Sequence, residues 1–156
     1  MASENTGGED MRNNDKHSVD YFNTFIATAP DAAADTGITP PAKENPTVAA
    51  RTFALIHDHP YEHTSGDVIF AVWADRRDIP AEDRPAARAE FYGKGQPCLR
   101  SSDLGKRYGW GIHADADGRV AAFAVDSPEY AAFESGVSPA DGSAVTVTRA
   151  MRSSRN

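Results

Sequence analysis

Residues 93–113 combine the side chains and glycines that suit an anion-binding site. Four of the side chains are cationic, those of Lys94, Arg100, Lys106 and Arg107. Asp103 is the only acid of the segment, so its net charge is +3. Guanidinium and ammonium groups complement phosphate and carboxylate, and the five glycines of the segment let backbone N–H groups approach a ligand. The segment therefore predicts a site for a small anionic ligand.

The strand expected after Arg107 adds space beside these charges. Large side chains alternate along one face, and the opposite face carries Gly109, Gly111 and His113. Such a face leaves room for a ligand, unless the glycines serve to let a helix pack closely and the cations are merely solvated. The predicted ligand-binding residues are Lys94, Arg100, Lys106, Arg107, Gly109, Gly111, His113 and Arg152, with Arg149 and Arg155 adding charge from the tail.

The same segment contains a candidate nucleophile, Cys98, the only cysteine of the chain. Nearby cations favour its thiolate, and His113 is the candidate base, so the pair predicts nucleophilic catalysis. A cysteine between proline and leucine is also typical of a small buried hydrophobe. The chain lacks a P-loop, a Gly-x-Ser-x-Gly elbow, a dinucleotide fingerprint and a His-Glu-x-x-His motif, so no catalytic motif decides between these interpretations.

Residues 57–63 concentrate side chains that bind metals. They include two carboxylates and three imidazoles, those of His57, His59 and His63, which are ligands that zinc accepts. However, His57 and His59 fall at a predicted helix end, and Pro60 restricts how the chain folds back. This arrangement is typical of a polar turn between helices. We therefore expect neither a metal site nor a bound cofactor, with these histidines as the candidates if a metal does bind.

The elements that position these residues begin with a strand. Residues 21–28 are rich in β-branched and aromatic side chains, which favour a buried strand. After a long loop, Asn45 and Pro46 are typical of a helix cap and a first helical position, and this helix must end before Pro60. A further short helix is predicted over residues 84–92, because a glycine follows it.

Residues 65–76 fit two patterns. Val68, Phe70 and Val72 alternate as in a strand, whereas the same segment also places its apolar residues at helical spacing. Thr64 and Asp67 stand three positions apart and resemble a capping box, with aspartate in place of the usual glutamate. Because the cap agrees with the helical period, a helix is favoured.

The second half of the chain predicts a hairpin, a helix and a last strand. Residues 108–114 and 119–125 form the hairpin around the turn at 115–118, a turn that also resembles the opening of a calcium loop but lacks its distal glutamate. Ser127 and Pro128 begin a helix that Gly136 ends, and residues 144–148 form the final strand. The order of these elements predicts an α+β fold, with a mixed or antiparallel sheet of about four strands packed by three to four helices.

Composition indicates one domain. A chain of 156 residues has room for one core, which we place at residues 19–156, after a polar, disordered tail at 1–18. The formal net charge of −7 makes nucleic acid an improbable partner. No segment predicts a membrane span or a secretory signal, and the single cysteine fits a reducing compartment, so a cytoplasmic protein is expected. The oligomeric state is left open by the sequence.

Four sequence blocks occur together in a characteristic order. They are Asn-Thr-Phe-Ile at 23–26, Lys-Gly-Gln-Pro-Cys-Leu-Arg at 94–100, Lys-Arg-Tyr-Gly-Trp-Gly-Ile-His at 106–113 and Ala-Met-Arg-Ser at 150–153. In these blocks the chain resembles a family of small bacterial proteins known only as a domain of unknown function. The resemblance implies a single bacterial domain from about residue 20 to the C-terminus, and it implies no activity, cofactor or catalytic residue.

Three functional hypotheses follow from these observations. The preferred one is a small binding module that holds an anionic ligand, bearing phosphate or carboxylate, over the basic segment. The second is a small enzyme that uses His113 with nearby arginines or with Cys98, which requires a second titratable group within hydrogen-bonding distance of the imidazole. The third is a protein-interaction or homodimerising domain that docks a partner through exposed aromatic side chains such as Trp110.

Overall fold

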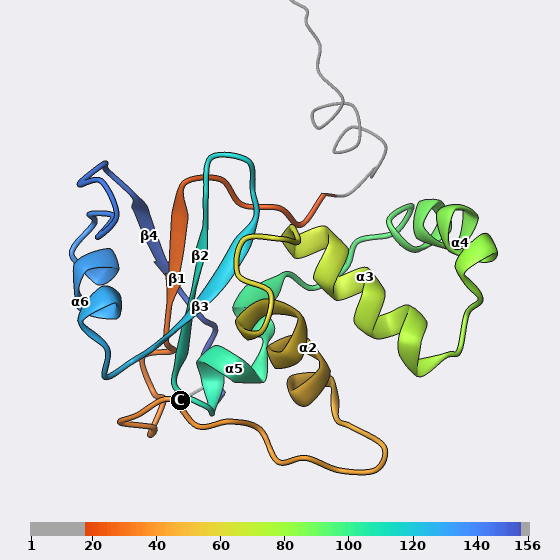
Figure 1. Cartoon of the computed structure of the whole chain (residues 1–156), viewed down its shortest axis with the longest axis horizontal. Coiled ribbons are helices and arrows are strands. Elements are labelled where there is room, and N and C mark those ends of the chain that lie inside the picture. Colours follow the sequence, from red (N-terminus) through yellow and green to blue (C-terminus); the bar gives the residue numbers. More distant parts are fainter. Residues whose placement is uncertain (1–17, 154–156) are drawn as a thin grey trace, which may run out of the picture.

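A four-stranded sheet forms the centre of the fold in the computed structural model, which describes residues 18–153 (Figure 1). Its strands are β1 (Thr24–Ala27), β2 (Trp110–Ala114), β3 (Val120–Ala124) and β4 (Thr146–Arg149). They lie in the order β3-β2-β1-β4, with β2 antiparallel to both β1 and β3 and with β4 parallel to β1. The sheet is therefore mixed, and the prediction of a small α+β fold is confirmed.

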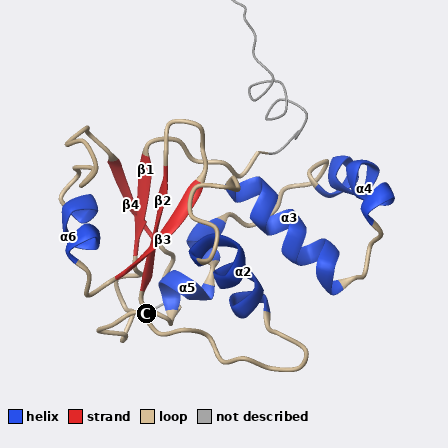
Figure 2. Ribbon diagram, viewed as in Figure 1, coloured by secondary structure: helices blue, strands red, loops and turns tan. Residues whose placement is uncertain are grey.

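The helices divide unequally between the two faces of the sheet (Figure 2). They are α2 (Val48–His57), α3 (Ser65–Arg76), α4 (Arg84–Phe91), α5 (Asp103–Lys106) and α6 (Pro128–Glu134), with 3-10 turns η1 (Ala81–Asp83) and η2 (Leu99–Ser101). Helices α2, α3 and α5 cover one face, α6 lies on the other, and α4 packs at the far end of α3. The described residues thus contain more helix than predicted, because α5 was not expected.

A capping box begins α3 and settles its assignment. The Thr64 side chain accepts a hydrogen bond from the Asp67 N–H, and the Asp67 carboxylate accepts one from the Thr64 N–H. The other Asp67 oxygen lies 2.8 Å from the Arg88 guanidinium, which joins α3 to α4. The cap therefore fixes residues 65–76 as a helix, as predicted.

Two other helix starts show how well caps are predicted. The Ser127 side chain accepts from the Tyr130 N–H at the start of α6, and Pro128 occupies the first turn, as predicted. For α2, the cap is Thr47, which accepts from the Ala50 N–H, and the predicted start at Asn45 was wrong. Asn45 lies before the helix, and its side chain instead accepts a hydrogen bond from the Arg51 guanidinium.

The two faces of the sheet have different interiors. Strand β2 directs Trp110, Ile112 and Ala114 into the larger apolar cluster with α2, α3 and α5. Phe25 and Ala27 of β1 face the other way and pack against α6 in a smaller cluster. The predicted alternation along β2 is confirmed. It buries Trp110, which is 7% exposed, and its indole N–H donates to the Ile38 carbonyl, so the exposed docking aromatic of the interaction hypothesis was wrong.

The loop between α2 and α3 is attached to the outer edge of β3. The Tyr61 N–H donates to the Val120 carbonyl, and the Val120 N–H donates to the His63 carbonyl, both at 2.9 Å. This attachment carries Tyr61 over the sheet. Among residues 18–153, no helix is long and apolar enough to cross a membrane. Residues 1–17 of the predicted tail, and Arg155, lie outside the described residues.

Candidate functional site

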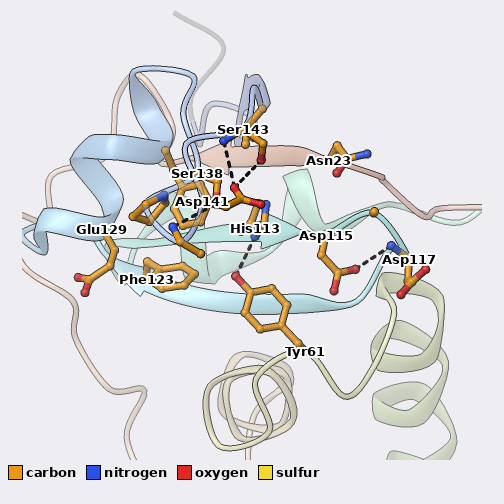
Figure 3. Close-up of a pocket in the computed structure, with 15 residues that line it drawn as sticks. Asn23, Tyr61, His113, Asp115, Asp117, Phe123, Glu129, Ser138, Asp141 and Ser143 are labelled. Carbon is orange, nitrogen blue, oxygen red and sulfur yellow. Dashed lines mark hydrogen bonds between the residues drawn. The ribbon is translucent and has the colours of Figure 1, made fainter.

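A cleft of about 610 Å3 opens over the face of the sheet that α6 covers (Figure 3). Its walls come from β2, β3, α6, the α2–α3 loop and the turn that precedes β4. The side chains that define its chemistry are those of Asn23, Tyr61, His113, Asp115, Asp117, Phe123, Glu129, Phe133, Ser138, Asp141 and Ser143. Aromatic rings and acids therefore dominate the lining.

His113 lies at the base of this cleft. It is 7% exposed, and its ring stacks on Phe133 with centroids 4.3 Å apart. Its Nδ1 lies 2.8 Å from the Tyr61 hydroxyl oxygen, a contact drawn in Figure 3. Nε2 has no hydrogen-bond partner among the described residues. It is not a buried atom, because the only buried side-chain polar atom without a partner in residues 18–153 is Ser65 Oγ. Nε2 is therefore open to the cleft.

The environment holds both members of this pair neutral. Burial lowers the pKa of His113 below its usual 6.5, although the charges of Asp115 and Asp141 act in the opposite direction. Burial, together with the charge of Asp115, raises the pKa of Tyr61 to about 12. At pH 7 a neutral imidazole is therefore hydrogen-bonded to a protonated phenol. Either the Tyr61 O–H donates to Nδ1, or Nδ1–H donates to the Tyr61 oxygen, depending on the tautomer. Nε2 faces the cleft as an acceptor in one tautomer and as a donor in the other.

Two carboxylates beside the imidazole are fixed by tight turns. Asp115 Oδ1 accepts from the N–H groups of Asp117 and Arg119, both at 2.9 Å. Asp141 Oδ1 accepts from the Ser143 N–H at 3.0 Å and from the Ser143 hydroxyl at 2.7 Å. These hydrogen bonds from Ser143 hold the pKa of Asp141 below its usual value, and the bond from the backbone N–H has the largest effect. Asp141 is therefore ionised at neutral pH, and both carboxylates are held in fixed orientations.

The cleft as a whole is negatively charged. In addition to Asp115 and Asp141, the acids Asp117 and Glu129 line it, whereas no lysine or arginine of the described chain does. His113 contributes no compensating charge while it is neutral. An anion would consequently meet repulsion in this cleft, and a cation would meet attraction.

Two residues of the cleft wall have an uncommon backbone conformation. Asn23 has φ of 50° and Tyr61 has φ of 61°, both in the left-handed region. Asp78 is the only other non-glycine residue of the described chain with a positive φ. Asparagine tolerates this region, whereas a bulky tyrosine enters it at a cost that the surrounding structure must offset. The bonds of the α2–α3 loop to Val120 provide such support.

The predicted glycine face is filled rather than open. A Cβ at Gly111 would lie 2.8 Å from the Tyr130 ring and closer still to Phe25. A Cβ at Gly109 would meet the Thr36 carbonyl oxygen, and Gly109 has φ of 77°. These two glycines therefore allow close packing of aromatic rings and backbone, and neither lines the cleft.

The predicted cations are not gathered around His113. Lys94 and Arg152 are exposed, and Arg107 forms an exposed ion pair with Asp103 at 3.6 Å. Arg100 Nε donates to the Arg149 carbonyl at 2.7 Å and so supports the segment after β4.

Helix α5, which carries Lys106, packs on the face of the sheet opposite His113. The basic segment and the imidazole therefore do not form one site, and anion binding by the basic segment stays a prediction.

Cys98 and His113 line different cavities. The Tyr21 hydroxyl lies 3.2 Å from the Cys98 sulfur, and Cys98 borders an apolar cavity of about 250 Å3 beside α2 and α3. Burial, followed by the neighbouring Cys98, raises the pKa of Tyr21 to about 12, so the phenol stays protonated beside the thiol. The structure does not place His113 as a base for this cysteine.

The three histidines of residues 57–63 do not converge on one point. His57 stacks on Phe53, with centroids 4.6 Å apart, and also contacts Trp110. His59 pairs with Glu62 at 3.4 Å, and its ring lies 5.9 Å from that of His63. Within residues 18–153, no three side chains of His, Cys, Asp or Glu are grouped so that they could hold a metal ion.

Sequence reasoning missed most of the cleft residues. Tyr61 lies in the middle of the histidine-rich turn, yet its partner His113 is 52 positions away, and no local pattern joins them. The turn at residues 115–118 was predicted, but its Asp115 was given no role at the site. Asp141 is followed by Gly142, with φ of 75°, a turn signal that marks the other side of the cleft.

A family of unknown function, DUF6157, matches residues 16–156. Neither the curated proteins nor the solved structures contain a match.

Proposed function

Because the chain belongs to DUF6157, a family of unknown function, we propose its function from the geometry alone: the protein binds a small polar molecule in the cleft beside His113 and Tyr61. The observation that carries this proposal is the buried imidazole of His113. Tyr61 holds its Nδ1 at 2.8 Å, while its Nε2 is left open to the cleft. A bound molecule would complete this half-satisfied group.

The cleft has the composition of a ligand site. Its volume of about 610 Å3 suits a small organic molecule, and such sites combine aromatic walls with a few oriented polar groups. Here Phe123 and Phe133 form the wall, and His113 and Asp141 supply oriented polar atoms. Because Nε2 has no protein partner and is open to the cleft, a bound molecule can form a hydrogen bond with it directly.

The backbone conformation of the cleft supports the same proposal. Left-handed conformations of residues other than glycine cost free energy and gather at binding and catalytic sites. Two of the three such residues in the described chain, Asn23 and Tyr61, line this cleft. The fold therefore maintains an uncommon conformation where it delivers the Tyr61 hydroxyl to His113.

A fragment screen followed by NMR tests the proposal. Nitrogen-15-labelled protein is titrated with a panel of amines, alcohols, carboxylates, amides, phosphates and divalent metals. We expect at least one fragment to shift the amide signals of Tyr61, His113 and Asp141 saturably. The shifts should weaken in Tyr61→Phe and in His113→Gln, but not in His59→Gln, since His59 lies on the same loop as Tyr61 outside the cleft. A panel that leaves the cleft signals unmoved contradicts the proposal.

A second candidate function is acid–base catalysis in the same cleft. The specific observation is the Tyr61–His113 contact, because it places a second titratable group within hydrogen-bonding distance of the imidazole. A neutral imidazole held by a phenol can accept a proton from a bound molecule through Nε2. Neither Cys98 nor an arginine takes part in this version of the enzyme hypothesis.

Turnover distinguishes the two candidates. Each fragment that binds is incubated with the protein, and its own NMR spectrum is followed for a day. Conversion that disappears in Tyr61→Phe supports catalysis, whereas fragments that bind and remain unchanged support a binding module. The same panel tests the anion prediction, because a phosphate that shifts residues 94–107 and leaves the cleft unmoved would place the binding site on the basic segment. A bacterial source and a cytoplasmic location stay predictions from the sequence.

A further inference from the structure

We propose that the molecule bound beside His113 carries a protonated amine, which is held between the carboxylates of Asp115 and Asp141. This inference rests on the proposed function and names the charge class of its ligand. The unpaired Nε2 of an imidazole that is 7% exposed identifies where the ligand makes contact. The charges around that atom then determine which kind of ligand fits.

Both carboxylates act on the imidazole. The charges of Asp115 and Asp141 each oppose the effect of burial on the pKa of His113, so both lie within electrostatic reach of the ring. Figure 3 shows the two side chains beside it. Asp115 uses Oδ1 for its turn, and Oδ2 has no partner among the described residues, so this oxygen remains available to a donor on the ligand.

No protein cation neutralises these carboxylates within the cleft. The described lining contains neither lysine nor arginine, and burial lowers the pKa of His113, so the ring is uncharged at pH 7. Arg119, whose N–H binds Asp115, is not among the lining residues. A ligand with a positive charge would therefore supply the missing counter-charge, whereas a phosphate or carboxylate would add to the repulsion.

The aromatic wall favours an organic cation. Phe123 is partly exposed and lines the cleft beside Phe133, with ring centroids 5.0 Å apart, so aromatic surface is accessible within the cleft. Ammonium groups are attracted to the faces of aromatic rings. An ammonium N–H can also donate to Nε2 when Nδ1–H donates to Tyr61. A metal ion fits less well, because no three of its usual ligands are grouped within residues 18–153.

Three probes of equal length test the charge class. Butylamine, butanol and butyrate share a four-carbon frame and carry a positive, a neutral and a negative end group at pH 7. We expect butylamine to shift the signals of His113, Asp115 and Asp141 saturably, and butyrate to leave them unmoved. Putrescine and a blocked Gly-Lys-Gly peptide extend the series. Tighter binding of putrescine identifies the amine as a free small molecule, and tighter binding of the peptide identifies it as a lysine side chain.

Isosteric variants test the two carboxylates. Asp115→Asn and Asp141→Asn keep the Oδ1 acceptor of each turn and remove only the charge. Each is expected to weaken butylamine binding by about twofold to fivefold, the range for ion pairs that water partly screens. Glu82→Gln removes an exposed acid outside the cleft and should change nothing.

The possible outcomes separate this inference from the proposed function. If butanol or butyrate binds in the cleft as tightly as butylamine, the cleft is a ligand site and the amine inference is overturned. Equal weakening by Asp141→Asn and Glu82→Gln also overturns it, because the attraction would then be unspecific. If no fragment of the full panel moves the cleft signals, both the inference and the proposed function fail.

Discussion

The two faces of the sheet have different surroundings, although the same strands form both. Ile112 and His113 are neighbours on β2, and Ile112 enters the large apolar cluster while His113 enters the cleft. Helix α3, with twelve residues, is about 18 Å long, whereas α6, with seven, is about 10 Å long. A single short helix leaves part of its face uncovered, and the cleft occupies that part.

This difference separates the residues that stabilise the domain from those that we propose to bind a ligand. The face under α2, α3 and α5 buries apolar side chains without an opening at Ile112, which is 2% exposed. The face under α6 combines a tight aromatic cluster around Phe25 with a cleft lined by His113, Asp115 and Asp141. We therefore expect substitutions on the first face to alter the free energy of unfolding most, and those in the cleft to alter it less.

The largest effect is expected from Ile112→Ala. The substitution removes buried methylene groups from the larger cluster, and such changes lower the free energy of unfolding by about 2–5 kcal/mol. Urea denaturation measures this loss. Ile38→Ala is the control, because Ile38 is 45% exposed and should change stability by no more than about 0.5 kcal/mol. Equal losses in both variants would contradict the division between the faces.

The next effect tests whether the α6 face is packed or open at Gly111. A Cβ there collides with the rings of Phe25 and Tyr130, so Gly111→Ala should lower the free energy of unfolding by about 1–3 kcal/mol. Gly95→Ala is the matched control, because nothing lies within 4 Å of its Cβ position. A neutral Gly111→Ala would mean that this strand face holds free space, as the sequence had suggested.

A smaller effect is expected from Tyr61→Phe. The substitution keeps the ring and removes the hydrogen bond to His113 Nδ1, which costs about 0.5–1.5 kcal/mol. Thermal unfolding measures the cost, and the side-chain NMR signals of His113 report the freed nitrogen. Tyr108→Phe should be close to neutral, since its hydroxyl has no partner among the described residues. If Tyr61→Phe leaves the His113 signals unchanged, the pair does not exist in solution.

The smallest effect is a dependence of stability on pH. Because burial lowers the pKa of His113 in the folded state, the unfolded chain takes up a proton more readily. The contribution of the neutral ring is therefore present above pH 6.5 and is lost as the pH falls through the folded pKa. Asp67 and Asp141, with pKa values below 3.8, act only at more acidic pH.

Urea titrations at pH 7.5 and pH 5.5 measure this dependence. The wild-type protein should lose more stability between these two values than His113→Gln, and His59→Gln should behave as the wild type does. An unchanged slope in His113→Gln would show that the imidazole is already accessible to protons in the folded state.

Local chemistry explains which elements of the fold were predictable. The caps at Thr64 and Ser127 act over three residues, and the sequence alone located both helices correctly. At α2, Asn45 and Thr47 both suit a cap, so residue type alone did not identify Thr47, whose side chain accepts from the Ala50 N–H. The four residues of α5 are too few to show a helical period, and the parallel pairing of β4 with β1 joins segments about 120 residues apart.

The site was less predictable, because it depends on contacts between distant segments. The position of His113 opposite the apolar face of β2 followed from alternation, and this residue does line the cleft. The glycines beside it suggested space, since the sequence does not reveal that Phe25 and Tyr130 fill it. The acidic lining was hidden for the same reason, because Asp115 and Asp141 belong to two separate turns that the fold brings to one ring.

The loop that carries Tyr61 also governs how this sheet can grow. The N–H and the carbonyl of Val120 are both hydrogen-bonded to that loop, and the Ala124 carbonyl accepts from the Ser127 N–H. Both ends of the outer edge of β3 are therefore occupied. An added strand, whether from a second copy or from an aggregate, meets a free edge more readily along β4, which is only four residues long and ends in Arg149. Short, charged edges resist such pairing. A deletion in this loop would thus disturb the cleft in which we propose that a ligand binds, and it would also expose the outer edge of β3 to pairing with another chain.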